Sequence, residues 1–186
     1  MAKAKKAAKR PAVKRAKPAP RAAAPRRPAK VAPVPPGYHT VTSYLTVADG
    51  AAALDFYTKA FGAKVTQKMP GPGGKLMHAE FKIGDSVVML SDEFPQGGTK
   101  SPRTLNGSTG SLFLYVPDVD AAFKRAVDAG CQVTMPLMDM FWGDRFGRVT
   151  DPFGHHWGLA SHKEDVSPAE INRRTAVAMS QMGQNS

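Results

Sequence analysis

Two histidines and a glutamate stand at positions where they can do acid–base chemistry. His78 and Glu80 are separated by one residue, and His156 follows His155 beside a predicted turn. Alternate residues of an extended strand share a face, so His78 and Glu80 point the same way. Imidazole and carboxylate groups act as general acids and bases or as metal ligands. His78, Glu80 and His156 are the candidate catalytic residues, and a purely structural hydrogen bond is the alternative for the first two.

A second group of side chains suits the binding of an anion. Asp144 and Arg145 are adjacent, and Arg148 follows three residues later. A guanidinium group can hold a carboxylate or phosphate through two parallel hydrogen bonds. Trp142 beside them can stack on a ligand. The alternative is a salt bridge between Asp144 and Arg145 or Arg148 that fixes the loop before the strand.

These residues belong to a sequence that repeats itself. Residues 44–49 (YLTVAD) begin a strand, an aspartate and a helix, and residues 113–118 (FLYVPD) begin another set 69 positions later. Each unit is predicted as strand, helix and three strands, with Asp49 and Asp118 capping the helices. A repeat of this length is typical of a duplicated half-domain. Two such halves facing each other enclose a cleft, where a ligand site is expected.

Composition divides the chain into three parts. We predict a disordered tail rich in Lys, Arg, Ala and Pro over residues 1–36, and a globular domain over 37–165. The two modules of that domain are predicted at 39–92 and 110–162. Residues 166–186 form the last part, in which Ser167 and Pro168 begin a short helix.

Charge is concentrated in the predicted tail. Residues 1–36 hold twelve lysines and arginines and no acidic residue, whereas the rest of the chain holds fourteen basic and fifteen acidic residues. The net charge of +11 therefore belongs to the tail. We expect weak, sequence-independent binding of nucleic acid or another polyanion through residues 1–36, with a solubilising extension as the alternative. The nearly neutral remainder does not indicate a nucleic-acid-binding domain.

The compartment is inferred from cysteine usage and hydropathy. Cys131 is the only cysteine, which excludes an internal disulfide and suits a reducing environment. No apolar run reaches 18 residues, and the N-terminus lacks the apolar core of a secretory signal. We expect a cytoplasmic protein without a membrane partner, associated with the nucleoid if the tail binds DNA.

Strand alternation separates a helix-covered face from a face that lines a cup. The predicted cup-facing residues mix hydroxyl groups, aromatic rings and a thioether: Thr42, Tyr44, Met89, Ser111, Phe113 and Tyr115. Together with Trp142, Asp144, Arg145 and Arg148 they are the candidate ligand-binding residues. A wall that is mostly apolar with a few polar groups is typical of a small-molecule site.

Several motifs carry a resemblance to a known family. They are LDFY at 54–57, AFG at 60–62, MHAE at 77–80, FWGDRFG at 141–147, DPFGHHW at 151–157 and HKEDV at 162–166. With these motifs the chain resembles the vicinal oxygen chelate superfamily of glyoxalases, bleomycin-resistance proteins and extradiol dioxygenases, and within it the PhnB-like group. The resemblance implies an α+β fold of two βαβββ modules forming a cup-shaped sheet, and a homodimer. Whether one chain or two build the cup is left open.

The resemblance also implies positions for a divalent metal, at Thr42, Met89, Ser111 and Gly158. None of these is His, Asp or Glu, the donors that such an ion needs. We therefore expect no metal and no cofactor.

Three functions follow from these observations. The expected one is binding of a small molecule in the cup, as in bleomycin-resistance proteins. The alternative is a glyoxalase-like lyase, isomerase or oxygenase that uses His78, Glu80 and His156 for acid–base catalysis or to hold a divalent metal. A polyanion-binding protein acting through its tail is the third. The sequence does not decide whether the protein is an enzyme.

Overall fold

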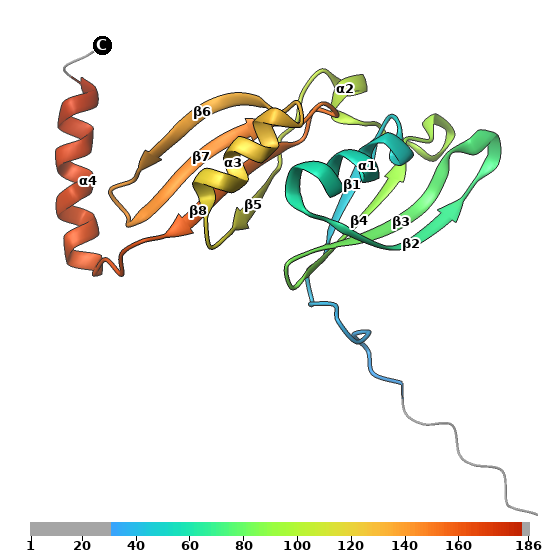
Figure 1. Ribbon diagram of the computed structural model, residues 1–186, viewed down its shortest axis with the longest axis horizontal. Coiled ribbons are helices and arrows are strands. Elements are labelled where there is room, and N and C mark those ends of the chain that lie inside the picture. Colours follow the sequence, from blue (N-terminus) through green and yellow to red (C-terminus); the bar gives the residue numbers. More distant parts are fainter. Residues whose placement is uncertain (1–30, 184–186) are drawn as a thin grey trace, which may run out of the picture. The chain divides into compact units, whose positions relative to one another are not determined.

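A computed structural model describes residues 31–183 (Figure 1). Most of the predicted tail, residues 1–30, lies outside the described residues, and so do residues 184–186 at the other end. Within the described part, no helix has the length and apolar character needed to span a membrane.

The first module is built as predicted, with one helix between the first and second of four strands. Its elements are β1 (Ser43–Val47), α1 (Gly50–Phe61), β2 (Lys64–Pro70), the 3₁₀ turn η1 (Pro72–Gly74), β3 (Leu76–Ile83) and β4 (Ser86–Asp92). The strand order in this sheet is β1-β4-β3-β2. β1 pairs parallel to β4, while the other pairs are antiparallel.

The second module repeats this topology. After η2 (Pro95–Gly97) and α2 (Pro102–Leu105) come β5 (Ser111–Tyr115), α3 (Val119–Asp128), β6 (Gln132–Asp139), β7 (Asp144–Thr150) and β8 (His156–His162). The strand order is β5-β8-β7-β6, again with one parallel pair, β5 with β8. The predicted α+β fold of two βαβββ modules is thus confirmed. The chain continues into α4 (Pro168–Gly183).

The sequence repeat is also a repeat of helix caps. The Asp49 side chain accepts a hydrogen bond from the backbone N–H of Ala52 at 2.9 Å, and Asp118 accepts one from Ala121 at 3.0 Å. Each bond satisfies an N–H at the first turn of α1 or α3, where no carbonyl is available. Gly62 then ends α1 in the left-handed conformation, with φ of 67°.

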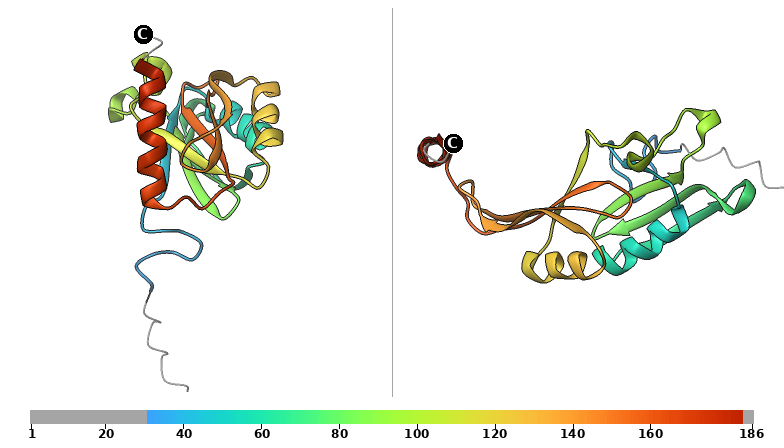
Figure 2. Two further views of the ribbon diagram at one scale, coloured as in Figure 1. Left: turned by 90° about the vertical axis from the view of Figure 1, so that its left-hand side faces the viewer. Right: turned by 90° about the horizontal axis from the view of Figure 1, so that it is seen from above.

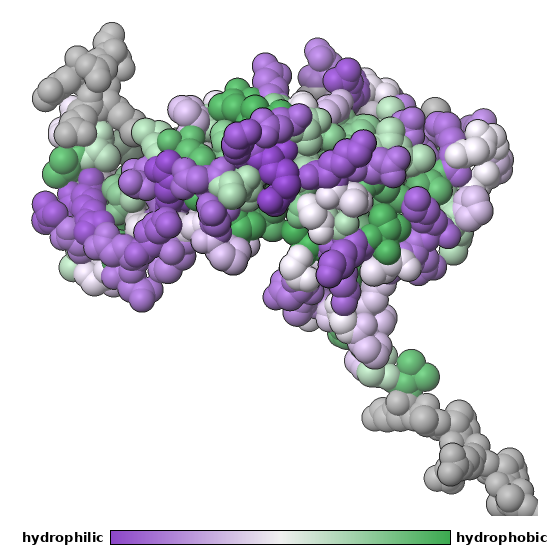
Figure 3. Space-filling model, in the orientation of Figure 1, coloured by the Kyte–Doolittle hydropathy of each residue, from purple (hydrophilic) through white to green (hydrophobic). Residues whose placement is uncertain are grey.

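Both main helices cover the same side of the two sheets. Figure 2 shows α1 and α3 next to each other on one side of the strands, with the other face of each sheet turned away from them. Figure 3 looks at this helix-bearing side, where hydrophilic residues are interspersed with smaller hydrophobic areas. We call the faces that point away from α1 and α3 the open faces.

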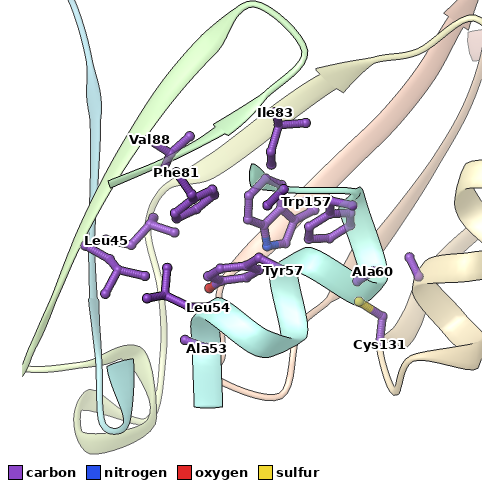
Figure 4. Close-up of a cluster of buried hydrophobic side chains, with 14 of the residues drawn as sticks. Leu45, Ala53, Leu54, Tyr57, Ala60, Phe81, Ile83, Val88, Cys131 and Trp157 are labelled. Atoms are coloured by element: carbon purple, nitrogen blue, oxygen red, sulfur yellow. The ribbon is translucent and has the colours of Figure 1, made fainter. Parts of the chain in front are cut away.

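One core joins the modules on the helix side. Tyr57 of α1 lies beside Trp157 of β8, and their rings are 5.6 Å apart (Figure 4). Asp151, only 3% exposed, accepts hydrogen bonds from the Tyr57 hydroxyl and the Trp157 indole N–H, each at 2.9 Å. Burial, and then the charge of Asp151, raise the pKa of Tyr57. The same two causes raise the pKa of Cys131 to about 12, so this buried thiol is unreactive.

Candidate functional site

The open face of the first sheet gathers four predicted site residues. Cross-strand pairing places Tyr44 beside Met89, and Met89 beside Glu80, so β1, β4 and β3 contribute one row of side chains. His78 lies two residues before Glu80 on β3. The intervening Ala79 is fully buried on the helix side, as strand alternation predicts.

Hydrogen bonds link the polar members of this group. The Tyr38 hydroxyl donates to Glu80, and His78 Nε2 lies 3.1 Å from Glu80 Oε1. The Tyr44 hydroxyl lies 3.5 Å from His78 Nδ1, at the limit for a hydrogen bond. The bond from Tyr38, followed by the one from His78, lowers the pKa of Glu80, while the pKa of Tyr38 is raised. Glu80 is therefore an ionised acceptor at neutral pH.

Tyr38 was missed by the sequence reasoning. It precedes β1 in irregular chain and contacts a residue 42 positions away. Strand periodicity cannot place such a residue, and the only signal in the sequence is an aromatic hydroxyl next to the expected first strand.

The open face of the second sheet carries an aromatic stack. The rings of Phe113 on β5 and Phe146 on β7 are 5.2 Å apart and nearly parallel, at 3°. Gly158 on β8 lies between them, where a Cβ would come within 2.9 Å of each ring. The Arg148 guanidinium lies 5.6 Å from the centre of the Phe146 ring, within cation–π range. A glycine thus makes room for an apolar floor with a cation at its side.

His156 lies at one end of this second face. It pairs with Ser111 and Thr150 across the sheet, and its Nδ1 is 2.9 Å from the Thr150 hydroxyl. In residues 31–183 no three His, Cys, Asp or Glu side chains are grouped to hold a metal. The three predicted catalytic residues therefore divide into a hydrogen-bonded pair, His78 and Glu80, and a separate His156.

Asp144 is a buried acceptor at the start of β7. It accepts from the Tyr115 hydroxyl at 2.9 Å and the Trp142 indole N–H at 3.1 Å, and it lies 2.8 Å from His162 Nδ1. Burial acts to raise the pKa of Asp144, but the bonds from His162, Tyr115 and Trp142 prevail and lower it. His162, the last residue of β8, was not a predicted site residue, although it begins the HKEDV motif at 162–166.

The salt bridge considered for Asp144 is not formed. Arg145 instead pairs with Asp120 at 2.7 Å and Asp139 at 3.3 Å. These bonds raise the pKa of Arg145 further. Since Asp120 belongs to α3, the structure places the Arg145 guanidinium on the helix side of β7.

Three hollows bring predicted ligand-binding residues together, and one of them, of about 610 Å³, is lined by Asp144 and Arg145, among others. A second of about 600 Å³ between β1 and β5 is lined by Thr42, Ser111, Phe113 and Tyr115, among others. The third, of about 390 Å³, is lined by Ser111, Phe113, Arg148 and His156, among others. Volumes of this size suit small-molecule ligands.

The four positions expected for a superfamily metal do not fit one. Thr42 uses its hydroxyl to donate to the carbonyl of His39 at 3.2 Å. Met89 offers a soft thioether, Ser111 a neutral hydroxyl, and Gly158 has no side chain. A divalent cation needs several deprotonatable N, O or S donors, and this set has none.

Comparison with known proteins identifies the family. The sequence profile of the Glyoxalase/Bleomycin resistance protein/Dioxygenase superfamily matches residues 38–159, which span both modules. The chain belongs to this superfamily.

Three similar proteins illustrate the range of sequence identity to this chain. An uncharacterised protein of Mycobacterium tuberculosis is 45% identical over 146 residues, covering 77% of this chain and 84% of that protein. The crystal structure of TioX from Micromonospora is similar at 29% identity and a TM-score of 0.53, covering 66% of this chain and 97% of TioX. A PhnB protein from Bacillus cereus shares the fold at 21% identity and a TM-score of 0.52, covering 66% of this chain and 99% of that protein.

Proposed function

We propose that this protein binds a small molecule on its open sheet faces without a metal, as a PhnB-like member of the superfamily. The observation that carries the proposal is the make-up of these faces. Phe113 and Tyr115 are 51% and 60% exposed, and several of the polar groups beside them, such as Asp144 and His156, are oriented by hydrogen bonds. Exposed rings beside oriented polar groups are what a ligand pocket presents. The unsuitable donors at the four expected metal positions support binding without an ion.

The cup is completed by a second copy of the chain in this proposal. The rings of Tyr44, Phe113 and Tyr115 are 51%, 51% and 60% exposed on a single chain, which leaves a row of aromatic side chains uncovered on the open faces. A second copy would cover them and narrow the hollows around a ligand. Sedimentation analysis of the full chain should give the mass of a dimer, and a monomer at micromolar concentration would refute this part.

A thermal-unfolding screen tests the binding proposal. We expect some amphipathic aromatic compounds to raise the unfolding temperature of the full chain, and to do so equally in EDTA. Phe113→Ala should abolish the stabilisation, because it removes the exposed half of the aromatic stack. Asp128→Asn, a change in an exposed salt bridge with Lys124 on α3, on the helix side of the sheets, is the matched control. Stabilisation that disappears in EDTA would contradict the proposal.

Acid–base catalysis at the first sheet is the second candidate function. The chain of contacts from Tyr38 through Glu80 and His78 to Tyr44 favours it, since a carboxylate that is hydrogen-bonded to an imidazole fixes the orientation of that ring. In this candidate His78 takes a proton from a ligand and Glu80 orients the ring. His78→Gln should then abolish turnover of a bound ligand while leaving ligand-induced stabilisation in place. Unchanged turnover in His78→Gln would exclude it.

A further inference from the structure

The hollow of about 390 Å³ on the second sheet has a distinct chemistry. Its floor is the stack of Phe113 and Phe146, which lie 5.2 Å apart across Gly158. Hydroxyl groups of Ser111 and Thr134 stand in its wall. A flat apolar group can lie on such a floor, because aromatic faces favour offset stacking with other planar groups.

The hollow is lined by one permanently charged side chain, the guanidinium of Arg148. Arg148 and His156 line it, and no aspartate or glutamate does so among the described residues. Arg148 makes no hydrogen bond or ion pair within residues 31–183, whereas Arg145 on the same strand is held by two aspartates. The guanidinium of Arg148 therefore keeps its planar set of N–H donors for a ligand.

His156 also lines this hollow, and a hydrogen bond orients its ring. Its Nδ1 lies 2.9 Å from the Thr150 hydroxyl. When that hydroxyl donates to Nδ1, the proton of the neutral ring is on Nε2, which becomes a donor. When the ring is protonated, both nitrogens donate and the charge adds to that of Arg148. In these two forms His156 supplies a second donor beside the guanidinium, whereas in the other neutral tautomer Nδ1 donates to the Thr150 hydroxyl and Nε2 is an acceptor.

The equivalent position in the first sheet shows that this charge is specific to one module. Cross-strand pairing places Glu80 beside Met89 in the first sheet and Arg148 beside Gly158 in the second. The repeated position therefore holds an acidic residue, Glu80, in the first module and a basic residue, Arg148, in the second. Glu80 is hydrogen-bonded to Tyr38 and His78, whereas Arg148 has no hydrogen-bond or ion-pair partner among residues 31–183. At this pair of equivalent positions, only the second sheet carries a cation.

We propose that the hollow on the second sheet binds an anionic oxygen group, a carboxylate or phosphate, attached to a flat apolar body. Arg148 holds the anion through two N–H donors, His156 and the wall hydroxyls add further bonds, and the apolar body lies on Phe113 and Phe146. This inference rests on the proposed binding function and names the class of ligand for it.

A matched set of naphthalene compounds tests the inference on the full chain. Naphthoate, naphthyl phosphate and the neutral naphthamide share the apolar body and differ in the polar group. We would follow backbone amide NMR signals of Ser111, Phe113 and Gly158 during titration of each compound. Naphthoate should bind about tenfold more tightly than naphthamide, because charge-assisted hydrogen bonds are worth more than neutral ones. The tighter of the two anions identifies the preferred group.

Substitutions of the two arginines of β7 test whether Arg148 is the residue that gives the preference for the anion. Arg148→Met should remove the tenfold preference for naphthoate and leave naphthamide binding unchanged. Arg148→Lys should keep part of it, since an ammonium group lacks the planar fork. Arg145→Met, on the other side of the strand, should keep the full preference. The basic tail is present in every variant, so its general attraction for anions cancels in these comparisons.

The outcomes separate this inference from the function on which it rests. Equal binding of naphthoate and naphthamide at the open face overturns the anion site and leaves small-molecule binding standing. A preference that survives in Arg148→Met also overturns it. If none of the three compounds shifts the open-face signals, the proposed binding function fails as well.

Discussion

Gly158 shows how one residue type decides what the second open face can hold. The superfamily resemblance implies a metal-ligand position here, but the side chain is absent and two aromatic rings meet over the site. A Cβ at this position would lie 2.9 Å from both Phe113 and Phe146, which is closer than carbon atoms approach. Position 158 therefore accommodates the packing of two aromatic rings and supplies no side chain to bind a metal ion.

Gly158→Ala should therefore disturb the aromatic stack. We expect a loss of about 1–3 kcal/mol in the free energy of unfolding, the usual cost of overpacking a filled site. Binding of an aromatic ligand should weaken at the same time, because the rings must separate. Gly107→Ala, where a Cβ meets nothing within 4 Å, is the control for both denaturant unfolding and ligand titration. An unchanged stability in Gly158→Ala would show that the rings move aside freely.

His162, at the end of β8, is expected to make the stability of the protein depend on pH. Its Nδ1 lies 2.8 Å from Asp144 and its Nε2 lies 3.0 Å from Asp165, and these two bonds raise its pKa above the ordinary 6.5. A histidine whose pKa is raised by folding stabilises the protein fully below the pKa of the unfolded state. That contribution is lost as the pH rises through the folded value.

We accordingly expect stability to fall as the pH rises above about 6.5, by a small amount because the side chain is half exposed. NMR titration of the His162 ring should give a pKa above 6.5, and His162→Gln should flatten this part of the stability profile. A pKa at or below the ordinary value would show that the two carboxylates do not act on the ring.

At the scale of elements, the repeat made the helices and most strands predictable. Asp49 and Asp118 mark the starts of both main helices, which they cap. On β3, strand alternation correctly places His78 and Glu80 on the face opposite the buried Ala79. The first strand was expected from residue 39 but begins at Ser43, and Val41 is 86% exposed. The parallel pairing with β4 starts at Ser43, opposite Val88, so the residues before Ser43 are not part of the sheet.

The site was less predictable than the elements. Alternation gave the open-face residues, but it could not show that Arg145 turns to Asp120 on α3, or that Tyr38 reaches Glu80 from outside any strand. Contacts between segments far apart in the sequence depend on how the elements pack. A periodicity of two within one strand carries no information about them.

Tyr57→Phe tests the bond that joins α1 to the second module. The Tyr57 hydroxyl donates to Asp151 in the core, and removing it leaves a buried carboxylate short of one partner. We expect a loss of about 1.5–3 kcal/mol in the free energy of unfolding, as for hydrogen bonds to charged groups. Tyr44→Phe makes the same chemical change on an exposed ring and should cost far less. Equal losses in the two variants would contradict the role given to Asp151.

At the scale of the whole molecule, charge divides the chain into two parts. All twelve lysines and arginines of residues 1–36 lie in a segment without acidic residues, while the rest has a net charge of −1. Attraction of the first part for polyanions is a proposal that rests on composition alone. The open-face binding proposed for the folded part is independent of it.

Removal of residues 1–36 tests this division. The full chain should be retained on DNA at low salt and released as the salt concentration rises, because retention depends on counterion release. The truncated chain should pass through without retention at any salt concentration. Retention that survives truncation would place a polyanion site on the folded part, contrary to its nearly neutral charge.

The central claim is that the open faces bind a small molecule without a metal. Its most direct test is to measure metal content and ligand-induced stabilisation on one sample of full-length protein, purified without chelator, before and after EDTA. We predict far less than one metal ion per chain and the same rise in unfolding temperature in both states. One bound ion per chain, lost in His78→Ala, with stabilisation that vanishes in EDTA, would contradict the account.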